Sequence, residues 1–295
     1  MFRFLFLFLG ILSYYSIKIA LEGISGPRQV LRLTMLDVGQ GDAIDIELPS
    51  KKHWLIDAGA RTNSFDTGER VILPFYKRGG ISELDAVILT HPDNDHIGGT
   101  ASLINAIKVN HVYMSQKSDG SPDMKRIDSS LSIQHKQVEY VSCRDTLAVE
   151  PGVRVYVLHP EKVRAGQIEP KSVLSSNNQS LVFMIVYGKT KFLFTGDVGK
   201  EGEDQIMQSF GDHLQADVLK VAHHGSSNCS TSGFLIGVQP HVALISCGKL
   251  NKYNHPSDVI LSRLSLLHAQ IHRSDREGAV ILESDGYSVR TIHWK

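Results

Sequence analysis

Three short segments of this chain contain the aspartate and histidine side chains that bind divalent metal ions. The first is HPDNDHIGG, which holds four possible ligands, His91, Asp93, Asp95 and His96, within six residues. This spacing allows His91 and Asp93 to face one metal ion, and Asp95 and His96 to face a second ion close by. Ligands from one rigid loop lose little entropy on binding, and two carboxylates offset much of the charge of the ions. The predicted chemistry is that of a two-metal site.

The other two segments are shorter. Asp197 ends the sequence FTGD, and His223 and His224 lie in VAHHGS. Each segment has an ordinary structural alternative, because an Asp-rich stretch caps a helix, a single Asp after a strand belongs to a turn, and paired histidines occur on surfaces. The three segments together are more specific than any one of them, since each follows an apolar run.

The apolar runs at 85–90, 190–195 and 217–222 are typical of buried strands. In α/β folds the ends of such strands converge on the functional crevice. We therefore expect the three segments to share one site.

The chain from residue 28 to residue 295 is predicted to form one α/β domain. Helices are expected at 71–76, 98–107, 200–210 and 257–268. The polar stretches 116–128 and 161–176 are expected to be loops. Further strands are expected at 30–36, 43–48, 54–56, 111–114, 138–141, 146–149, 154–158, 181–187, 242–246, 279–283 and 287–293.

Composition excludes several classes of protein. Of the 295 residues 42% are hydrophobic, which is enough to build a core and excludes a disordered chain. Lys+Arg and Asp+Glu both number 31, so any polyanion must be held by a local patch or by metals. The cysteines at 143, 229 and 247 form no CxxC pair, which argues against a zinc finger and a disulfide framework.

The first 27 residues form a separate zone. An uncharged run from 4 to 17 lies between Arg3 and Lys18, and it is shorter than the roughly 20 residues that a membrane-spanning helix needs. A signal peptide is disfavoured because Lys18 would occupy a position of the cleavage site that requires a small residue. An amphipathic or buried segment remains an alternative. A membrane anchor is the favoured interpretation, either as an uncleaved anchor or as the remnant of a last transmembrane helix.

The motifs together resemble those of metallo-β-lactamase-fold hydrolases, and more closely those of the β-lactamase-like domain at the C-terminal end of ComEC-type DNA-uptake proteins. The resemblance covers about residues 31–293. It rests on THPDNDHIGG, TGD and HHGS, with LDVGQGD at 36–42, LIDAG at 55–59, NNQSL at 177–181 and NKYNHP at 251–256.

The resemblance implies an α/β fold, a four-layer αβ/βα sandwich with the metals at the edges of its sheets. It implies that Asp197 bridges the two ions, and that one of His223 and His224 completes the second site while the other faces the substrate. Asp93 stands where a histidine is common in the family, and no histidine precedes Asp197 at the usual position. The expected cofactors are therefore two divalent ions, Mn or Zn, with the preference moved toward manganese.

Two close divalent ions activate a water molecule and clamp an in-line displacement at phosphorus, so no protein nucleophile is required. Asp95 or Asp197 is expected to orient the hydroxide and assist proton transfer. Tyr253 and His255 are candidate phosphate contacts or proton donors. His255 is equally well explained as a loop residue before a helix that begins at Pro256.

Five further residues are expected to support the ligand histidines or to face the substrate. Asp37 and Asp57 have an equally good alternative as caps of Gly-rich turns. Asp42, Asn178 and Ser226 are placed at the site by the motifs that contain them.

The function implied by the resemblance is a metal-dependent phosphodiesterase or nuclease that acts on DNA during uptake. The implied partners are DNA, the membrane through residues 1–27, and a DNA-uptake channel. The catalytic domain is expected to be anchored to the inner membrane on its extracytoplasmic face. A hydrolase of a small ester, phosphoester or lactam and a non-catalytic DNA-docking module remain alternatives.

Overall fold

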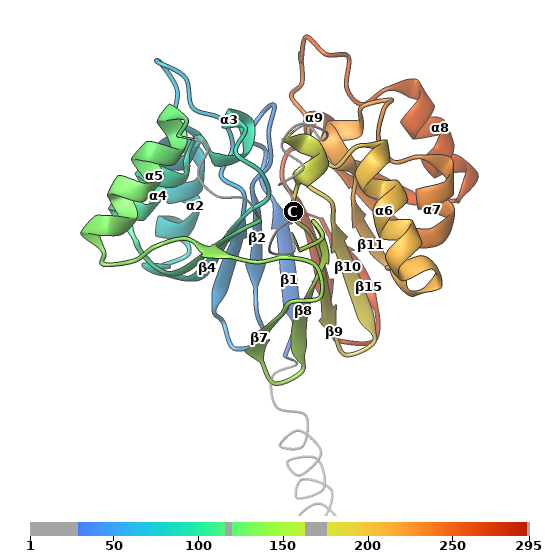
Figure 1. Cartoon of the computed structure of the whole chain (residues 1–295), viewed down its shortest axis with the longest axis horizontal. Helices are drawn as coiled ribbons and strands as arrows, with labels where there is room; N and C mark the ends of the chain where they lie inside the picture. Colours follow the sequence, from blue (N-terminus) through green and yellow to red (C-terminus); the bar gives the residue numbers. More distant parts are fainter. Residues whose placement is uncertain (1–28, 116–119, 163–175, 294–295) are drawn as a thin grey trace, which may run out of the picture.

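The computed structural model describes residues 29–115, 120–162 and 176–293. The predicted anchor, residues 1–27, lies outside the described residues. Two mixed β-sheets face each other, and helices cover the outer face of each sheet (Figure 1). This arrangement confirms the predicted four-layer αβ/βα sandwich.

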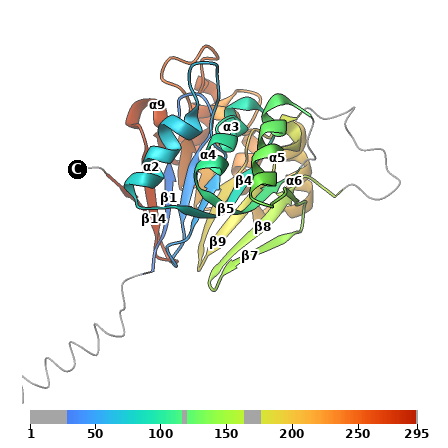
Figure 2. The same ribbon diagram turned by 90° about the vertical axis from the view of Figure 1, so that its left-hand side faces the viewer.

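The first sheet has eight strands in the order β15-β14-β1-β2-β3-β4-β5-β6. Helices α2, α4 and α5 lie together on its outer face (Figure 2). The strands are β1 (Leu31–Met35), β2 (Ile44–Glu47), β3 (His53–Ile56), β4 (Glu83–Leu89), β5 (Lys108–Met114), β6 (Glu139–Tyr140), β14 (Val280–Ser284) and β15 (Val289–Ile292). The helices on this side are η1 (Gly68–Ile72), α2 (Leu73–Arg78), α3 (Asn94–Ile97), α4 (Thr100–Ala106) and α5 (Pro122–Ile133).

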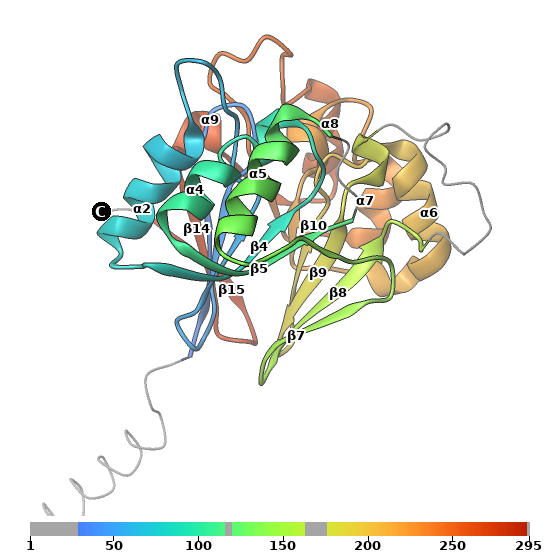
Figure 3. The same cartoon turned by 60° about the vertical axis from the view of Figure 1, so that its left-hand side comes forward.

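The second sheet has seven strands in the order β13-β12-β11-β10-β9-β8-β7. Its outer face is covered by α6, α7 and α8, so that both sheets lie between two layers of helices (Figure 3). The strands are β7 (Thr146–Glu150), β8 (Val153–His159), β9 (Val182–Tyr187), β10 (Thr190–Phe194), β11 (Val218–Lys220), β12 (Val242–Ile245) and β13 (Gln270–Arg273). The helices are η3 (Asn177–Gln179), α6 (Lys200–Phe210), η4 (Gly211–Leu214), η5 (Ala222–Gly225), α7 (Ser232–Val238), α8 (Asp258–Leu266) and α9 (Ser274–Glu277).

Burial on both faces explains why the central strands are continuously apolar. In β4, Ala86 and Ile88 belong to the core between the sheets, whereas Val87 and Leu89 pack under the outer helices. Successive side chains of a strand point to opposite faces, so a strand buried on both sides must be apolar at every position.

Strand direction places the chemistry at one edge. β3, β4 and β5 are parallel, as are β10, β11 and β12. Parallel strands end on the same side of a sheet, so Asp57, His91, Asp197 and His224 all emerge where the two sheets meet.

The predicted loop at 116–128 is wrong from Pro122 onward, because these residues form α5, while residues 116–119 lie outside the described residues. Ser121 accepts a hydrogen bond from the Met124 amide (3.3 Å), and proline occupies the first helical turn. Met124, Ile127 and Leu131 form the buried face. Their three- and four-residue spacing is helical, but the surrounding polar residues concealed it. Helix α7 and strand β13 were not predicted either.

Across the three described ranges, no helix has the length and apolarity needed to cross a bilayer.

Candidate metal centre

The predicted ligands from three separate segments meet at this edge of the sandwich. In the described residues, four overlapping groups of three residues have their potential ligand atoms within 4.8 Å of one another, and two of these groups contain only predicted metal ligands. One group consists of His91, His96 and Asp197, and the other of Asp95, His96 and His224. Of the two adjacent histidines, the buried His224 is thus the one placed beside Asp95.

Asp197 belongs to the first group and also approaches His224 of the second, as a bridging ligand would. Its Oδ2 atom is 3.8 Å from Nε2 of His91 and 3.8 Å from Nε2 of His224. Its Oδ1 atom is 3.2 Å from Nε2 of His96. Asp95 closes the second group, with Oδ2 3.3 Å from Nε2 of His224.

The buried carboxylate of Asp57 orients the histidines of the first segment. It accepts hydrogen bonds from Nδ1 of His96 (2.8 Å), from the Thr90 amide (2.8 Å) and from the Thr90 hydroxyl (2.7 Å). Because that hydroxyl has given its only proton to Asp57, it accepts from Nδ1 of His91 (3.0 Å). One carboxylate therefore holds His96 directly and His91 through Thr90.

His224 is oriented in the same way by a backbone group. Its Nδ1 atom donates to the carbonyl of Ser246 at 2.9 Å. The Nε2 atoms of His91, His96 and His224, and Oδ1 of Asp197, are buried without a hydrogen-bond partner in the described part of the chain. Such atoms are costly to bury, and histidine ligands of metals are held by Nδ1 in this manner. The donor set therefore fits a dinuclear divalent-metal site.

The charges of the centre couple metal binding to the release of protons. Burial, assisted by His96, lowers the pKa of His91 to about 3, so this imidazole is neutral near pH 7. Burial opposes the charging of His224, but the neighbouring carboxylates, Asp197 first, raise its pKa to about 9. The pKa of His96 is likewise raised well above its usual value. Protons on two imidazoles balance the carboxylates here, and binding of metal would release them.

The paired histidines have an unusual backbone. His223 and His224 both lie in the left-handed region, with φ of 49° and 55°. This conformation is unfavourable for residues with a Cβ atom, and it concentrates at functional sites. Gly225 follows with φ of 86°, where an added Cβ would lie 2.5 Å from Cβ of Pro256. The turn therefore needs glycine at this position.

Asp42, predicted beside the metals, forms a buried ion pair that sequence reasoning did not identify. Its Oδ2 atom lies 2.6 Å from Nζ of Lys220, and its Oδ1 atom lies 3.5 Å from Nδ1 of His224. Burial raises the pKa of Asp42, but Lys220 and the adjacent histidines outweigh that effect and lower it strongly. The available clue was a lysine inside the apolar run DVLKVA.

Four predicted residues line the rim of the centre. Oδ2 of Asp93 lies 3.8 Å from Nε2 of His91, and its side chain is 42% exposed. Nε2 of His223 lies 3.6 Å from Oδ2 of Asp197. The ring of His255 packs against His223, with centroids 5.8 Å apart. Tyr253 stacks in turn on His255.

The remaining predicted residues make structural contacts. Asp37 is exposed and accepts a hydrogen bond from the amide two residues ahead (3.2 Å). Asn178 accepts from the Gly199 amide (2.8 Å) and donates to Glu201 (2.7 Å), which secures the start of α6. The Ser226 amide donates to the carbonyl of the third residue before it (2.9 Å) and closes η5.

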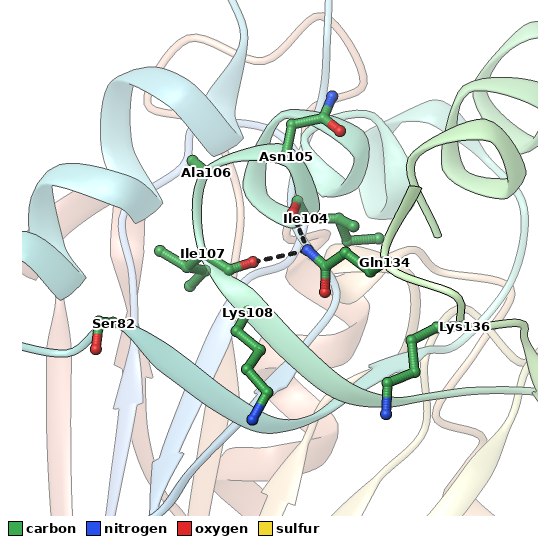
Figure 4. Close-up of a pocket in the computed structure, with 8 residues that line it drawn as sticks. All are labelled: Ser82, Ile104, Asn105, Ala106, Ile107, Lys108, Gln134 and Lys136. Carbon is green, nitrogen blue, oxygen red and sulfur yellow. Dashed lines mark hydrogen bonds between the residues drawn. The ribbon is translucent and has the colours of Figure 1, made fainter. Parts of the chain in front are cut away.

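A separate surface pocket of about 440 Å³ lies at the opposite end of β4 and β5 (Figure 4). Within it, the Gln134 side chain donates to the carbonyls of Ile104 and Ile107, and Lys108 and Lys136 lie at its border. It contains no acidic or histidine side chain. It therefore lacks the residues needed for metal chemistry.

A family model described as the metallo-beta-lactamase superfamily matches residues 36–249. The chain therefore belongs to this superfamily, as its motifs predicted. It is 33% identical over 258 residues to ComE operon protein 3 of Bacillus subtilis (strain 168), covering 83% of this chain and 32% of that protein. It is 28% identical over 254 residues to competence protein ComA of Neisseria gonorrhoeae, covering 86% of this chain and 32% of that protein. It is 30% identical over 246 residues to recombination protein 2 of Haemophilus influenzae, covering 83% of this chain and 28% of that protein.

The chain thus spans about a third of the length of the curated relatives it matches. Among solved structures, CmlA, a diiron beta-hydroxylase from Streptomyces venezuelae, has a TM-score of 0.54 at 13% identity. The match covers 91% of this chain and 55% of that one. This likeness supports the fold.

The role of Asp57 is tested by Asp57→Asn. The asparagine amide keeps the shape of the carboxylate but places an N–H group opposite Thr90 and His96, which themselves donate hydrogen bonds here. We therefore expect roughly 10- to 100-fold weaker binding of Mn²⁺ or Zn²⁺. Metal affinity is measured by competition with a chelator. Asp37→Asn is the matched control and should bind metal as the wild type does. Thr90→Val supplies an independent test, since it disconnects His91 and leaves Asp57 intact. Unchanged affinity in both variants would contradict this role.

The ion pair of Asp42 and Lys220 is tested by urea denaturation of the metal-free protein. Lys220→Met leaves a buried carboxylate without its partner, and we expect a loss of about 3–5 kcal/mol in the free energy of unfolding. The double variant that also carries Asp42→Asn should recover much of the lost stability, because it no longer buries an unpaired carboxylate. Lys200→Met, which removes an exposed pair with Asp204, should change stability little. A double variant no more stable than Lys220→Met would refute the pairing.

Proposed function

We propose that this domain is a metal-dependent phosphodiesterase or nuclease. The observation that supports it most strongly is the convergence of three buried imidazole Nε2 atoms with the Asp197 carboxylate, since none of these nitrogens has a hydrogen-bond partner in the described residues. Divalent ions bound there would supply Lewis-acid activation of water and of a phosphoryl group. Two metal positions side by side suit phosphodiester hydrolysis, because the oxygen of the attacking water and the leaving oxygen lie in line at phosphorus.

The chain's own residues position the reactants. Asp197 reaches both ligand groups and holds them at a fixed separation. The Asp95 side chain is 35% exposed, so its carboxylate is accessible to the attacking water and could take a proton from it. His223, whose side chain is 36% exposed, and the adjacent His255 lie at the rim of the centre, where we propose that the leaving group departs. Burial and the neighbouring His223 and His224 lower the pKa of His255, so it is neutral near pH 7.

DNA is the substrate we propose. The support comes from the resemblance to ComEC-type DNA-uptake proteins and from relatives named as competence and recombination proteins. A DNA-uptake channel would be the corresponding partner. A small ester, phosphoester or lactam is the alternative substrate. A purely DNA-docking role is disfavoured, because such a role does not require a complete ligand set.

Manganese is the metal we propose for turnover. Carboxylates of Asp93, Asp95 and Asp197 accompany the imidazoles, and oxygen ligands favour manganese over zinc. The metal-stripped protein reconstituted with Mn²⁺ should therefore turn over faster than the zinc form.

The proposed activity is tested with single- and double-stranded DNA, bis-p-nitrophenyl phosphate and a β-lactam. We expect hydrolysis of the phosphodiesters, and we expect Asp197→Ala to reduce it to the uncatalysed level because both metal positions lose a ligand. The metal-free variant should remain folded, since apolar burial supplies most of the stability, although its melting temperature should fall because His96 and His224 lose the carboxylate that raises their pKa values. Asp212→Ala, at an exposed carboxylate, is the control. Hydrolysis of the β-lactam alone would refute the phosphodiesterase assignment.

We further propose that residues 1–27 anchor the domain outside the inner membrane, where incoming DNA would be met. The support is the 14-residue apolar run and the resemblance to DNA-uptake proteins. Protease added to spheroplasts should digest the domain, whereas protection until lysis would place it in the cytoplasm. A cytoplasmic marker protein, intact in the same sample, verifies that the membrane is closed.

A further inference from the structure

The segment between β12 and α8, residues 246–257, forms a loop beside the metal centre (orange, at the top of Figure 1). Both of its ends are fastened to loops that carry centre residues. The Gly248 amide donates to the Gln40 side chain (3.2 Å), next to Asp42. The Ser257 amide donates to the carbonyl of Gly225 (2.9 Å), which follows the paired histidines.

Asn251 holds the middle of this loop in one shape. Its Nδ2 atom donates to the carbonyls of Gly248 (2.9 Å) and His255 (2.7 Å). Its Oδ1 atom accepts from the amides of His255 (2.9 Å) and Tyr253 (3.2 Å). Four hydrogen bonds to one side chain make the loop a preorganised support for the rings it carries.

These rings form a continuous row leading outward from the centre. His223 lies 3.6 Å from Asp197, and the ring of His255 lies 5.8 Å from that of His223. Tyr253 stacks on His255, with centroids 5.8 Å apart and ring planes at 18°. Although it is stacked, Tyr253 remains 54% exposed, so part of its ring is accessible to a ligand from solvent.

The loop is also locally basic. Residues 247–257 include Lys249 and Lys252 and contain no aspartate or glutamate, although the whole chain has no net charge. Nζ of Lys252 lies 5.1 Å from the centroid of the Tyr253 ring, so an exposed cation covers that aromatic surface. Basic and aromatic side chains combined in this way are what single-stranded nucleic acids bind.

We propose that Tyr253 is the stacking position for the nucleobase of the nucleotide whose phosphate enters the metal centre. This inference rests on the proposed phosphodiesterase function and specifies its substrate as single-stranded nucleic acid. The base takes the place of the Lys252 ammonium on the ring, and that ammonium then meets the adjacent phosphate. Stacking uses the face that every base has, so the subsite tolerates all four bases.

Binding is tested first, in the presence of a metal chelator so that no cleavage occurs. Fluorescence anisotropy compares a labelled oligothymidine with an abasic oligonucleotide of equal length. The wild type should bind oligothymidine more tightly. Tyr253→Ala should lose about 5- to 100-fold of that affinity, whereas Tyr253→Phe should retain it because it keeps the aromatic ring.

The control residue is Tyr287, which is 77% exposed and has Nζ of Lys189 5.6 Å from its ring centroid. It lies in the β14–β15 turn, beside the β9–β10 turn and therefore at the end of β10 opposite Asp197. Tyr287→Ala should bind both oligonucleotides as the wild type does. Equal losses in Tyr253→Ala and Tyr287→Ala, or equal binding of the two oligonucleotides by the wild type, would overturn the inference.

Kinetics separate this inference from the function on which it rests. Thymidine 5′-(p-nitrophenyl phosphate) and methyl p-nitrophenyl phosphate share a reacting group and differ in the nucleoside. The ratio of their kcat/KM values should fall about 5- to 100-fold in Tyr253→Ala. If the wild type hydrolyses both esters but this ratio is unchanged, the base subsite is wrong and the phosphodiesterase stands. If the wild type hydrolyses neither, the proposed function fails, and the oligonucleotide binding still decides the stacking.

Discussion

The buried carboxylate of Asp57 is the contact on which the rest of the centre depends. It accepts three hydrogen bonds and through them sets the tautomer of two histidines from the neighbouring loop. If those Nδ1 atoms were free, the imidazoles could rotate, and their Nε2 atoms would not converge on Asp197. The parallel pairing of β3 with β4 makes this possible, because its register of Ile56 with Ile88 brings Asp57 beside the end of β4, within hydrogen-bond reach of Thr90.

The second sheet brings the complementary half of the centre. Asp197 and His224 follow two parallel strands, and the core between the sheets holds those strands against the first half. The Asp42–Lys220 pair crosses this junction, since Asp42 precedes β2 and Lys220 ends β11. A buried cation next to carboxylates reduces their mutual repulsion before metal is bound. The geometry of the centre is therefore a property of the packed sandwich rather than of any one loop.

Much of this could be predicted from the sequence, for identifiable reasons. The ligands lie in three compact motifs, each after an apolar strand, and strand ends converge in α/β folds. Helix α6 was predicted with its observed bounds, because its amphipathic pattern is regular. Helix α5 was not, since its polar residues dominate the local composition.

Other features depend on contacts between distant segments. The role of Lys220 is to pair with Asp42, which is 178 positions away, and no local sequence pattern predicts that pair. The choice between His223 and His224 depends on backbone angles that neighbouring residues do not disclose. The row of rings from His223 to Tyr253 likewise joins two loops that are separate in the sequence.

Anomalous diffraction at the manganese edge, from crystals of the protein loaded with Mn²⁺, tests whether the centre holds two metal ions. Two peaks about 3.5–4 Å apart are expected. One should lie beside Nε2 of His91 and the other beside Nε2 of His224, with the Asp197 carboxylate between them. A single peak, or peaks that do not contact these atoms, would contradict the two-metal centre.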